Sequence, residues 1–214
     1  MDIDADIYII DLFDTPKELV SKLHKNGKKV IAYFSAGSYE SWREDAQLFP
    51  KEVLGDKMDG WDERWLDISN PKLNNIMSKR IKLAKEKGFD GVEADNVDGY
   101  KNKTGFKLKE KDQLSYNIFL SNEAHKNGLS IALKNDIDQI KELESYFDFA
   151  INEQCHEFNE CDIYKIFISS NKPVFNAEYK YDNMKEICKQ SAKLGIDTLF
   201  LPLELDGSFR KECN

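Results

Sequence analysis

Residues 71–95, PKLNNIMSKRIKLAKEKGFDGVEAD, decide the fold that this sequence predicts. Residues 71–87 form an amphipathic segment behind Asn70, a residue type that caps helices, and Gly88 is a typical residue to end a helix. Residues 91–95 are a short apolar run of the kind found in buried strands, and they include Glu93 and Asp95. The segment therefore predicts a helix that leads directly into a buried strand.

The same alternation recurs along the chain. Eight short apolar runs occupy residues 6–11, 29–34, 65–68, 91–95, 129–135, 147–153, 173–178 and 198–203. Helical patterns separate them at residues 16–26, 71–87, 112–127 and 182–194, with shorter or looser ones at 40–48, 137–145 and 161–169. Repeated strand–helix units produce parallel strands with helical crossovers. Eight units predict an α/β fold of the (β/α)8 TIM-barrel type, lean for its class, with residues 1–214 as a single domain. An open doubly wound sheet is the alternative, but it would carry a glycine-rich turn after the first strand, and residues 11–15 contain no glycine.

The composition excludes several classes of protein. The chain has 31 Lys and Arg against 39 Asp and Glu, a formal net charge of −8, which argues against binding to nucleic acid or to an anionic membrane. Hydrophobic residues make up 41%, enough for a core, and no apolar run approaches the ~20 residues of a membrane helix. Residues 1–6 lack the features of a signal peptide, so the protein is either cytosolic or a chain whose leader has been removed.

The cysteines lie close together in the sequence, at Cys155, Cys161, Cys188 and Cys213. None of them forms a CxxC pair, which argues against a zinc site. An even, clustered set is compatible with two disulfides and an oxidising compartment, and four free thiols in a reducing cell are the alternative.

In a TIM barrel the active site lies at the carboxyl ends of the strands. Polar residues at or near these ends are Asp11, Tyr33, Asp67, Asp95, Asn96, Asp98, Lys134, Asn135, Glu153 and Glu178. Carboxylates and amides beside aromatic residues are typical of glycoside hydrolysis, in which one carboxyl group protonates the leaving oxygen and another attacks carbon or activates water. Asp95 and Glu153, at the ends of the fourth and sixth strands, are the candidate pair.

Several of these residues also have structural interpretations. Glu93 shares a strand face with Asp95 and is expected one layer deeper, as a hydrogen-bonding acid. Asp11 can cap the following helix, and Asp67 can form an ion pair at the rim. Lys134 can form a Schiff base in an aldolase, but it is expected to pair with the surrounding acids. Neither a His-x-His pair nor a calcium-loop spacing is present, so no metal ion or other cofactor is expected.

Longer motifs add a family resemblance. They are residues 10–15 (IDLFDT), 30–43 (VIAYFSAGSYESWR), 60–68 (GWDERWLDI), 88–100 (GFDGVEADNVDGY), 112–117 (DQLSYN), 132–135 (ALKN), 148–155 (DFAINEQC), 160–161 (EC) and 174–179 (VFNAEY). With these motifs, in this order, the chain resembles glycoside hydrolase family 114, the endo-α-1,4-polygalactosaminidases, between residues 10 and 179.

The resemblance implies a TIM barrel and a secreted or surface enzyme. Its implied reaction is endo-cleavage of α-1,4-linked galactosamine in partly deacetylated galactosamine-containing exopolysaccharide. Asp95 and Glu153 are the implied catalytic acids, with Glu153 interpreted as the general acid and Asp95 as the nucleophile or base. The remaining strand-end residues named above are implied as substrate-binding residues. A Cys155–Cys161 disulfide is also implied, which leaves Cys188 and Cys213 for a second bridge.

The acidic chain suits a cationic polysaccharide as its partner, and a monomer is expected. One departure from the family concerns the N-terminus. Family members usually carry a tryptophan- and glutamine-containing segment before the first strand, whereas this chain begins almost directly at that strand. The alternative function is therefore a degenerate barrel that binds polysaccharide without hydrolysis, although the presence of both acids argues against it.

Overall fold

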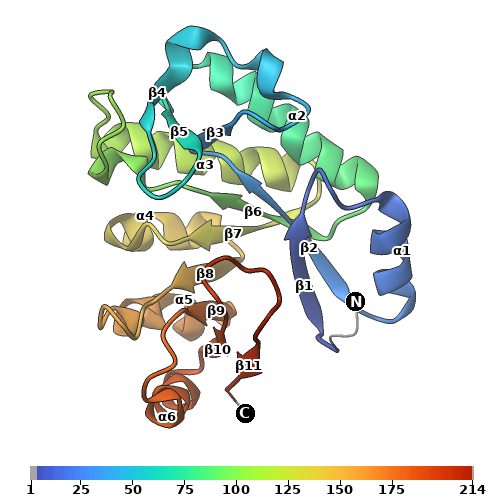
Figure 1. The fold of residues 1–214 in the computed structure, drawn as a ribbon, viewed down its shortest axis with the longest axis vertical. Coiled ribbons are helices and arrows are strands. Elements are labelled where there is room, and N and C mark those ends of the chain that lie inside the picture. Colours follow the sequence, from blue (N-terminus) through green and yellow to red (C-terminus); the bar gives the residue numbers. More distant parts are fainter. Residues whose placement is uncertain (1–3, 214) are drawn as a thin grey trace. The chain divides into compact units, whose positions relative to one another are not determined.

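The computed structural model describes residues 4–213. The expectation about a signal peptide concerns residues 1–6, and residues 1–3 lie outside this range. The chain divides into two compact units, Met1–Ala132 and Leu133–Asn214. In each unit parallel strands are joined by helical crossovers (Figure 1). This confirms the predicted TIM-like α/β fold class, while the single-domain assignment stays a prediction.

The first unit contains four parallel strands in the order β1-β2-β6-β7 and a separate antiparallel sheet in the order β3-β5-β4. Its strands are β1 (Ile7–Asp11), β2 (Lys29–Ser35), β3 (Ser38–Glu40), β4 (Leu54–Lys57), β5 (Glu63–Leu66), β6 (Gly91–Asp95) and β7 (Ser130–Lys134), whose last two residues belong to the second unit. Its helices are α1 (Lys17–Lys25), α2 (Lys72–Lys87) and α3 (Glu110–Lys126), with short 3-10 turns at η1 (Ala46–Leu48), η2 (Lys51–Val53) and η3 (Gly99–Lys101).

Helix α2 follows the pattern from which the fold was predicted. Its buried residues, Leu73, Ile76, Met77, Arg80, Ile81 and Ala84, recur at spacings of three and four and so share one face of the helix. Gly88 ends the helix in the left-handed conformation, with φ +93°, which a glycine adopts without the steric cost of a Cβ atom. The chain then turns directly into β6, which pairs with β2 in parallel.

One expected strand is placed differently. Residues 65–68 were expected to form the third parallel strand, but β5 pairs antiparallel with β3 and β4 in the small sheet. The predicted short helix at 40–48 is also wrong for most of its length, because Glu40 ends β3 and residues 41–45 form turns, whereas η1 covers its last three residues. The insertion between β2 and α2 therefore builds a three-stranded sheet beside the parallel strands (Figure 1).

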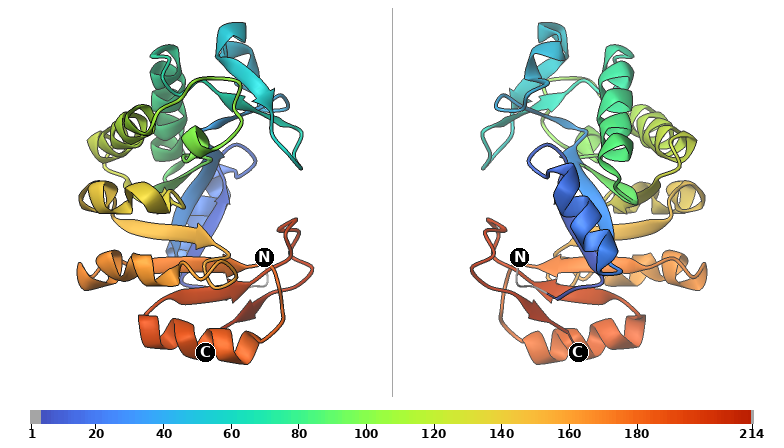
Figure 2. Two further views of the ribbon diagram at one scale, coloured as in Figure 1. Left: turned by 90° about the vertical axis from the view of Figure 1, so that its left-hand side faces the viewer. Right: turned by 90° about the vertical axis from the view of Figure 1, so that its right-hand side faces the viewer.

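The second unit continues from β7 with parallel strands β8 and β9 and then β10, and β11 pairs antiparallel with β10. Its strands are β8 (Phe149–Glu153), β9 (Val174–Glu178), β10 (Asp197–Phe200) and β11 (Lys211–Glu212). Its helices are α4 (Ile140–Leu143), α5 (Lys165–Ser169) and α6 (Met184–Leu194), with 3-10 turns η4 (Ile137–Gln139), η5 (Glu144–Tyr146) and η6 (Cys161–Tyr164). Figure 2 shows α6 alongside the strands β9 and β10 that it connects.

Two disulfides reinforce this unit, Cys155–Cys161 and Cys188–Cys213, and no free cysteine is found in the described chain. The first pairing is the one that the family resemblance implied, and the second is the one that this pairing left for the remaining cysteines. Within residues 4–213 no helix combines the length and the apolar character that crossing a bilayer requires.

Candidate functional site

The predicted site residues fall into two groups, one in each unit. The first unit holds Asp11, Tyr33, Asp67, Asp95, Asn96 and Asp98, and the second holds Lys134, Asn135, Glu153 and Glu178. All of them except Tyr33 lie at the last residues of a strand or within a few residues after it. Within each group the structure brings carboxylates into contact with hydroxyl, amide or cationic groups.

Asp95 ends β6 and is held by a tyrosine from the neighbouring strand. The Tyr33 hydroxyl on β2 donates a hydrogen bond to Asp95 Oδ2 at 2.9 Å. The parallel register pairs Tyr33 with Glu93 and Ser35 with Asp95, so Tyr33 reaches forward along the sheet to the strand end. Glu93 is 4% exposed whereas Asp95 is half-buried, as expected for residues one layer apart on the same strand face.

The turn after β6 is fixed by a close backbone approach at Gly37. The amides of Ala36 and Gly37 donate to the Asp95 carbonyl at 2.9 and 3.1 Å. A Cβ atom at residue 37 would lie 1.6 Å from the Asn96 carbonyl oxygen, so only glycine fits this position. Asn96 itself has φ +61°, a conformation that asparagine tolerates better than most residues. Its side-chain amide donates a hydrogen bond to Ser35 Oγ at 2.9 Å, and this amide also lies next to the carboxylate of Asp95.

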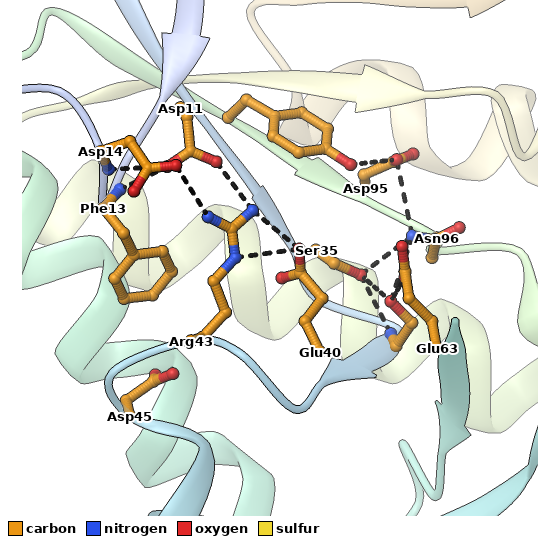
Figure 3. Close-up of polar contacts among 12 residues, drawn as sticks. Asp11, Phe13, Asp14, Ser35, Glu40, Arg43, Asp45, Glu63, Asp95 and Asn96 are labelled. Carbon is orange, nitrogen blue, oxygen red and sulfur yellow. Dashed lines mark hydrogen bonds and ion pairs between the residues drawn. The ribbon is translucent and has the colours of Figure 1, made fainter. Parts of the chain in front are cut away.

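Asp11 ends β1, where its carboxylate caps the turn that follows and also forms an ion pair, while its role in substrate binding stays a prediction. Its Oδ1 accepts the backbone amides of Phe13 and Asp14 at 2.8 and 2.9 Å, which caps the turn that follows. Its Oδ2 forms an ion pair with Arg43 at 2.7 Å, and the same guanidinium bonds Glu40 (Figure 3). Burial acts to lower the pKa of Arg43, but the carboxylates of Glu40 and Asp11 raise it well above its usual value, so Arg43 stays charged.

A second arginine, the buried Arg80 of α2, lies next to these residues. Arg80 is 1% exposed, and its guanidinium makes two 2.8 Å bonds to Asp45 and one of 2.7 Å to the Ser35 carbonyl. It also stacks over the rings of Phe13 and Phe49, at 5.0 and 5.2 Å from their centroids. The insertion between β2 and α2 is thereby tied to the end of β2, where Ser35 lies.

Asp67 has different surroundings from those expected, whereas Asp98 follows its strand as predicted. Asp67 follows β5 of the small sheet rather than a parallel strand, and its Oδ1 accepts the amide and hydroxyl of Ser69 at 3.2 and 2.6 Å. Its carboxylate therefore caps the turn that leads into α2. Asp98 begins the turn η3, where its carbonyl accepts the Lys101 amide at 3.2 Å. Substrate contacts by either residue stay a prediction.

Glu153 ends β8 and is again held by a tyrosine from the neighbouring strand. The hydroxyl of Tyr179, directly after β9, donates a short hydrogen bond to Glu153 Oε1. The Lys134 ammonium at the end of β7 lies 3.6 Å from the same oxygen, which is the pairing with an acid that was expected of this lysine. Asn135 Oδ1 accepts the Glu153 amide at 3.0 Å and so fixes the backbone at the strand end.

Glu178 belongs to a buried polar network rather than to an open surface. It is 1% exposed, and its Oε1 accepts the His156 amide at 2.8 Å and the Asn176 side-chain amide at 3.0 Å. The imidazole of His156 bonds Ser191 Oγ at 2.7 Å, and burial lowers the pKa of this histidine against the opposing charge of Glu178. The network connects the turn after β8 to the end of β9.

One cluster in the described chain has the spacing of a metal site, formed by Cys155, His156 and Cys161, whose ligand atoms lie within 4.8 Å of one another. Both sulfurs are bonded to each other in the disulfide, so neither can serve as a thiolate ligand. This cluster is therefore a structural element of the turn after β8.

Sequence reasoning missed four polar residues that complete these groups: Glu40, Arg43, Glu63 and Tyr179. The first three lie in the insertion between β2 and α2, where the strand–helix alternation breaks down, and long irregular insertions of this kind are often functional. Tyr179 follows directly after Glu178 at the end of β9, so its place at a strand end was the available signal.

Comparisons with known proteins agree with this architecture. The crystal structure of Aspergillus fumigatus Ega3 in complex with galactosamine superposes with a TM-score of 0.94 at 39% identity, covering 99% of this chain and 89% of that one. The glycoside hydrolase domain of PelA from Pseudomonas aeruginosa shares the fold at 13% identity, with a TM-score of 0.70 over 95% of this chain and 89% of that one. Among curated proteins, none matches the chain. The family model of glycoside hydrolases GH114 matches residues 1–214, and the chain belongs to this family.

Proposed function

We propose that this protein is an endo-acting hydrolase of α-1,4-linked galactosamine in partly deacetylated galactosamine-containing polysaccharide, with Asp95 and Glu153 as its two catalytic carboxyl groups. One observation carries the choice of these two acids. Each ends a parallel strand and accepts a hydrogen bond from a tyrosine: Tyr33 of the neighbouring strand β2 for Asp95, and Tyr179, directly after the neighbouring strand β9, for Glu153. A carboxylate held in one orientation at a strand end is what glycoside hydrolysis requires.

The choice of substrate rests on relatedness and on charge. Ega3, 39% identical to this chain, was crystallised with galactosamine. The chain carries a formal charge of −8, and a protonated amino sugar is attracted to an acidic protein. In the first unit Arg43 forms ion pairs with the carboxylates of Asp11, Asp14 and Glu40, and Glu63 lies close enough for the charges of Arg43, Glu40 and Asp95 to act on it. This excess of negative charge favours a cationic sugar over a neutral one.

The first test is a digest of partly deacetylated α-1,4-galactosaminan, with products read by mass spectrometry. We expect the native protein to release a series of short oligomers, and we expect Asp95→Asn and Glu153→Gln each to lower the rate by at least about a thousandfold, because each removes a group that reacts in the transition state. Asp59→Asn, an exposed acid of the β4–β5 turn, is the matched control and should keep native activity. Polymer binding without any product would instead indicate a degenerate barrel that only binds polysaccharide.

The roles of the two acids can be separated with an activated substrate. We assign proton donation to Glu153 and attack on carbon or activation of water to Asp95. A leaving group that departs without protonation makes a general acid dispensable. Glu153→Gln should therefore recover most of its lost rate on an aryl galactosaminide with a good leaving group, whereas Asp95→Asn should stay inactive. The opposite pattern would reverse the assignment.

The two disulfides support an extracellular or cell-surface location, because disulfides form and persist in oxidising compartments. A polymer-degrading enzyme also meets its substrate outside the cell. Expression with an export signal should yield protein without free thiols, measured by alkylation under denaturing conditions.

A further inference from the structure

Glu63 lies close to Asp95 but was not among the residues expected at the site. It begins β5 and pairs in register with Glu40 of β3. Its Oε2 accepts a short hydrogen bond from Ser38 Oγ, and Ser38 Oγ lies 2.5 Å from Ser35 Oγ. Asn96 donates to Ser35, so a chain of hydrogen bonds runs from Glu63 to the residue beside Asp95 (Figure 3).

The carboxylate of Glu63 is half-buried, and within residues 4–213 no lysine or arginine forms an ion pair with it. Arg43, whose positive charge acts on Glu63, is bonded to Asp11 and Glu40. Burial raises the pKa of Glu63, and the like charges of Glu40 and Asp95 raise it further, against the opposing effects of Ser38 and Arg43.

Glu40 provides an independent sign that a hydrogen-bond donor is missing here, although its other oxygen is bound by Arg43. It is 3% exposed, and its Oε2 has no hydrogen-bond partner in the described part of the chain. Buried carboxylate oxygens are normally paired, because leaving one unsatisfied costs free energy. Glu40 and Glu63 are paired in the β3–β5 register, so in the part of the chain that the structure describes an unsatisfied acceptor lies beside a carboxylate without an ion pair, and the charge of Asp95 acts on that carboxylate.

We propose that Glu63 is a specificity-determining residue that binds the ammonium group of a deacetylated galactosamine unit while Asp95 faces that sugar. The proposal rests on the proposed function, since it names the group of the substrate that this part of the site recognises. An ammonium group supplies a positive charge and donates hydrogen bonds to the Glu63 oxygen that Ser38 leaves open. An N-acetylated unit is neutral at this position and gains none of this attraction.

The test compares galactosamine oligomers with N-acetylgalactosamine oligomers of the same length. Binding is measured by calorimetry in the Glu153→Gln background, where hydrolysis is blocked and the first unit is unaltered. Adding Glu63→Gln should weaken binding of the deacetylated oligomer by about tenfold to a hundredfold, the range expected for a hydrogen bond to a charged group, and leave the N-acetylated oligomer within about twofold. Asp62→Asn, the exposed neighbour that undergoes the same change of charge, should alter neither affinity.

Equal losses for both oligomers, or no loss for either, would overturn the proposal. If Glu63→Gln does not fold, Ser38→Ala serves instead, because it removes the hydrogen bond to the Glu63 carboxylate and leaves the acid itself in place. It should reduce the preference for the deacetylated oligomer by about threefold, and an unchanged preference would count against Glu63.

A native protein that binds the oligomers but cuts none would contradict the proposed hydrolysis alone. A protein that binds neither oligomer would contradict both proposals.

Discussion

At the scale of single residues, Gly37 is the position with the least room for change. A Cβ atom there would lie 1.6 Å from the Asn96 carbonyl oxygen, and the obstacle is backbone rather than a flexible side chain. We expect Gly37→Ala to displace the turn after β6, to lower the free energy of unfolding by about 1–3 kcal/mol or more, and to reduce hydrolysis at least tenfold by moving Asp95. Urea denaturation and the oligosaccharide digest measure the two effects.

Gly27 offers the matched control for this substitution. It has φ +76°, and a Cβ atom at this position would meet no atom within 4 Å. Gly27→Ala should therefore cost only the strain of a left-handed backbone, roughly 1 kcal/mol, and should leave the rate of hydrolysis unchanged. If Gly37→Ala were as mild as Gly27→Ala, the backbone approach between residues 37 and 96 would not be what positions Asp95.

Some residue-level predictions depended on the strand ends. Asp95 and Glu153 were chosen because each ends an apolar run and lies in a family motif, and the structure places both at the last residue of a strand. Arg43 and Glu63 could not be found in this way, because their positions depend on an irregular insertion whose pairing brings distant residues together. Such non-local contacts leave no periodic signal in a sequence.

At the scale of secondary-structure elements, Asp90 joins three of them. Its carboxylate accepts hydrogen bonds from His24 of α1 at 2.8 Å, and from Lys29 and the Val30 amide of β2 at 2.9 Å each, directly before β6 begins. Burial acts to raise the pKa of Asp90, but these hydrogen bonds outweigh it and hold the pKa below its usual value.

A carboxylate with a lowered pKa stabilises the fold above its ordinary pKa of ~3.9, and this contribution is lost as the pH falls through the lower folded value. Asp90→Asn should therefore lower the free energy of unfolding by about 1–3 kcal/mol at pH 7. The difference from the native protein should shrink as the pH falls below ~4, as measured by urea denaturation at each pH. A difference that stays constant with pH would show that packing rather than charge makes Asp90 important.

The small sheet explains why one element was misplaced. Residues 65–68, WLDI, read as a buried strand because they are apolar, and Trp65, Leu66 and Ile68 are indeed buried. Burial alone does not say which sheet a strand joins. The short separation between β4 and β5 permits an antiparallel pair, which needs no crossover helix, whereas a parallel partner would have needed one. The seven other expected strands correspond to β1, β2, β6, β7, β8, β9 and β10.

At the scale of the whole molecule, the order of strands and crossovers was predictable because it is repeated and local. The longer helices α2 and α6 each end at a glycine in the left-handed conformation, a stop signal that can be read locally in the sequence. The sequence motifs indicated the family, and the family model, which matches residues 1–214, confirms it. The role proposed for Glu63 was not predictable, because it depends on the side-chain positions of the β3–β5 pair, which the sequence pattern does not give.

The net charge of the molecule leads to a prediction about salt. A chain with formal charge −8 attracts a polycationic substrate over the Debye length, which falls from ~30 Å at ~0.01 M salt to ~3 Å at ~1 M. We expect KM for a deacetylated oligomer to rise about tenfold or more over this range, while kcat changes little, because screening acts on the approach of the substrate and less on groups already in contact. Initial rates at several salt concentrations give both constants.

The N-acetylated oligomer is neutral, so its KM should stay within about twofold. Parallel increases for the two substrates would show that salt acts on the protein itself, and the attraction between the acidic chain and the amino sugar would then have no part in substrate capture.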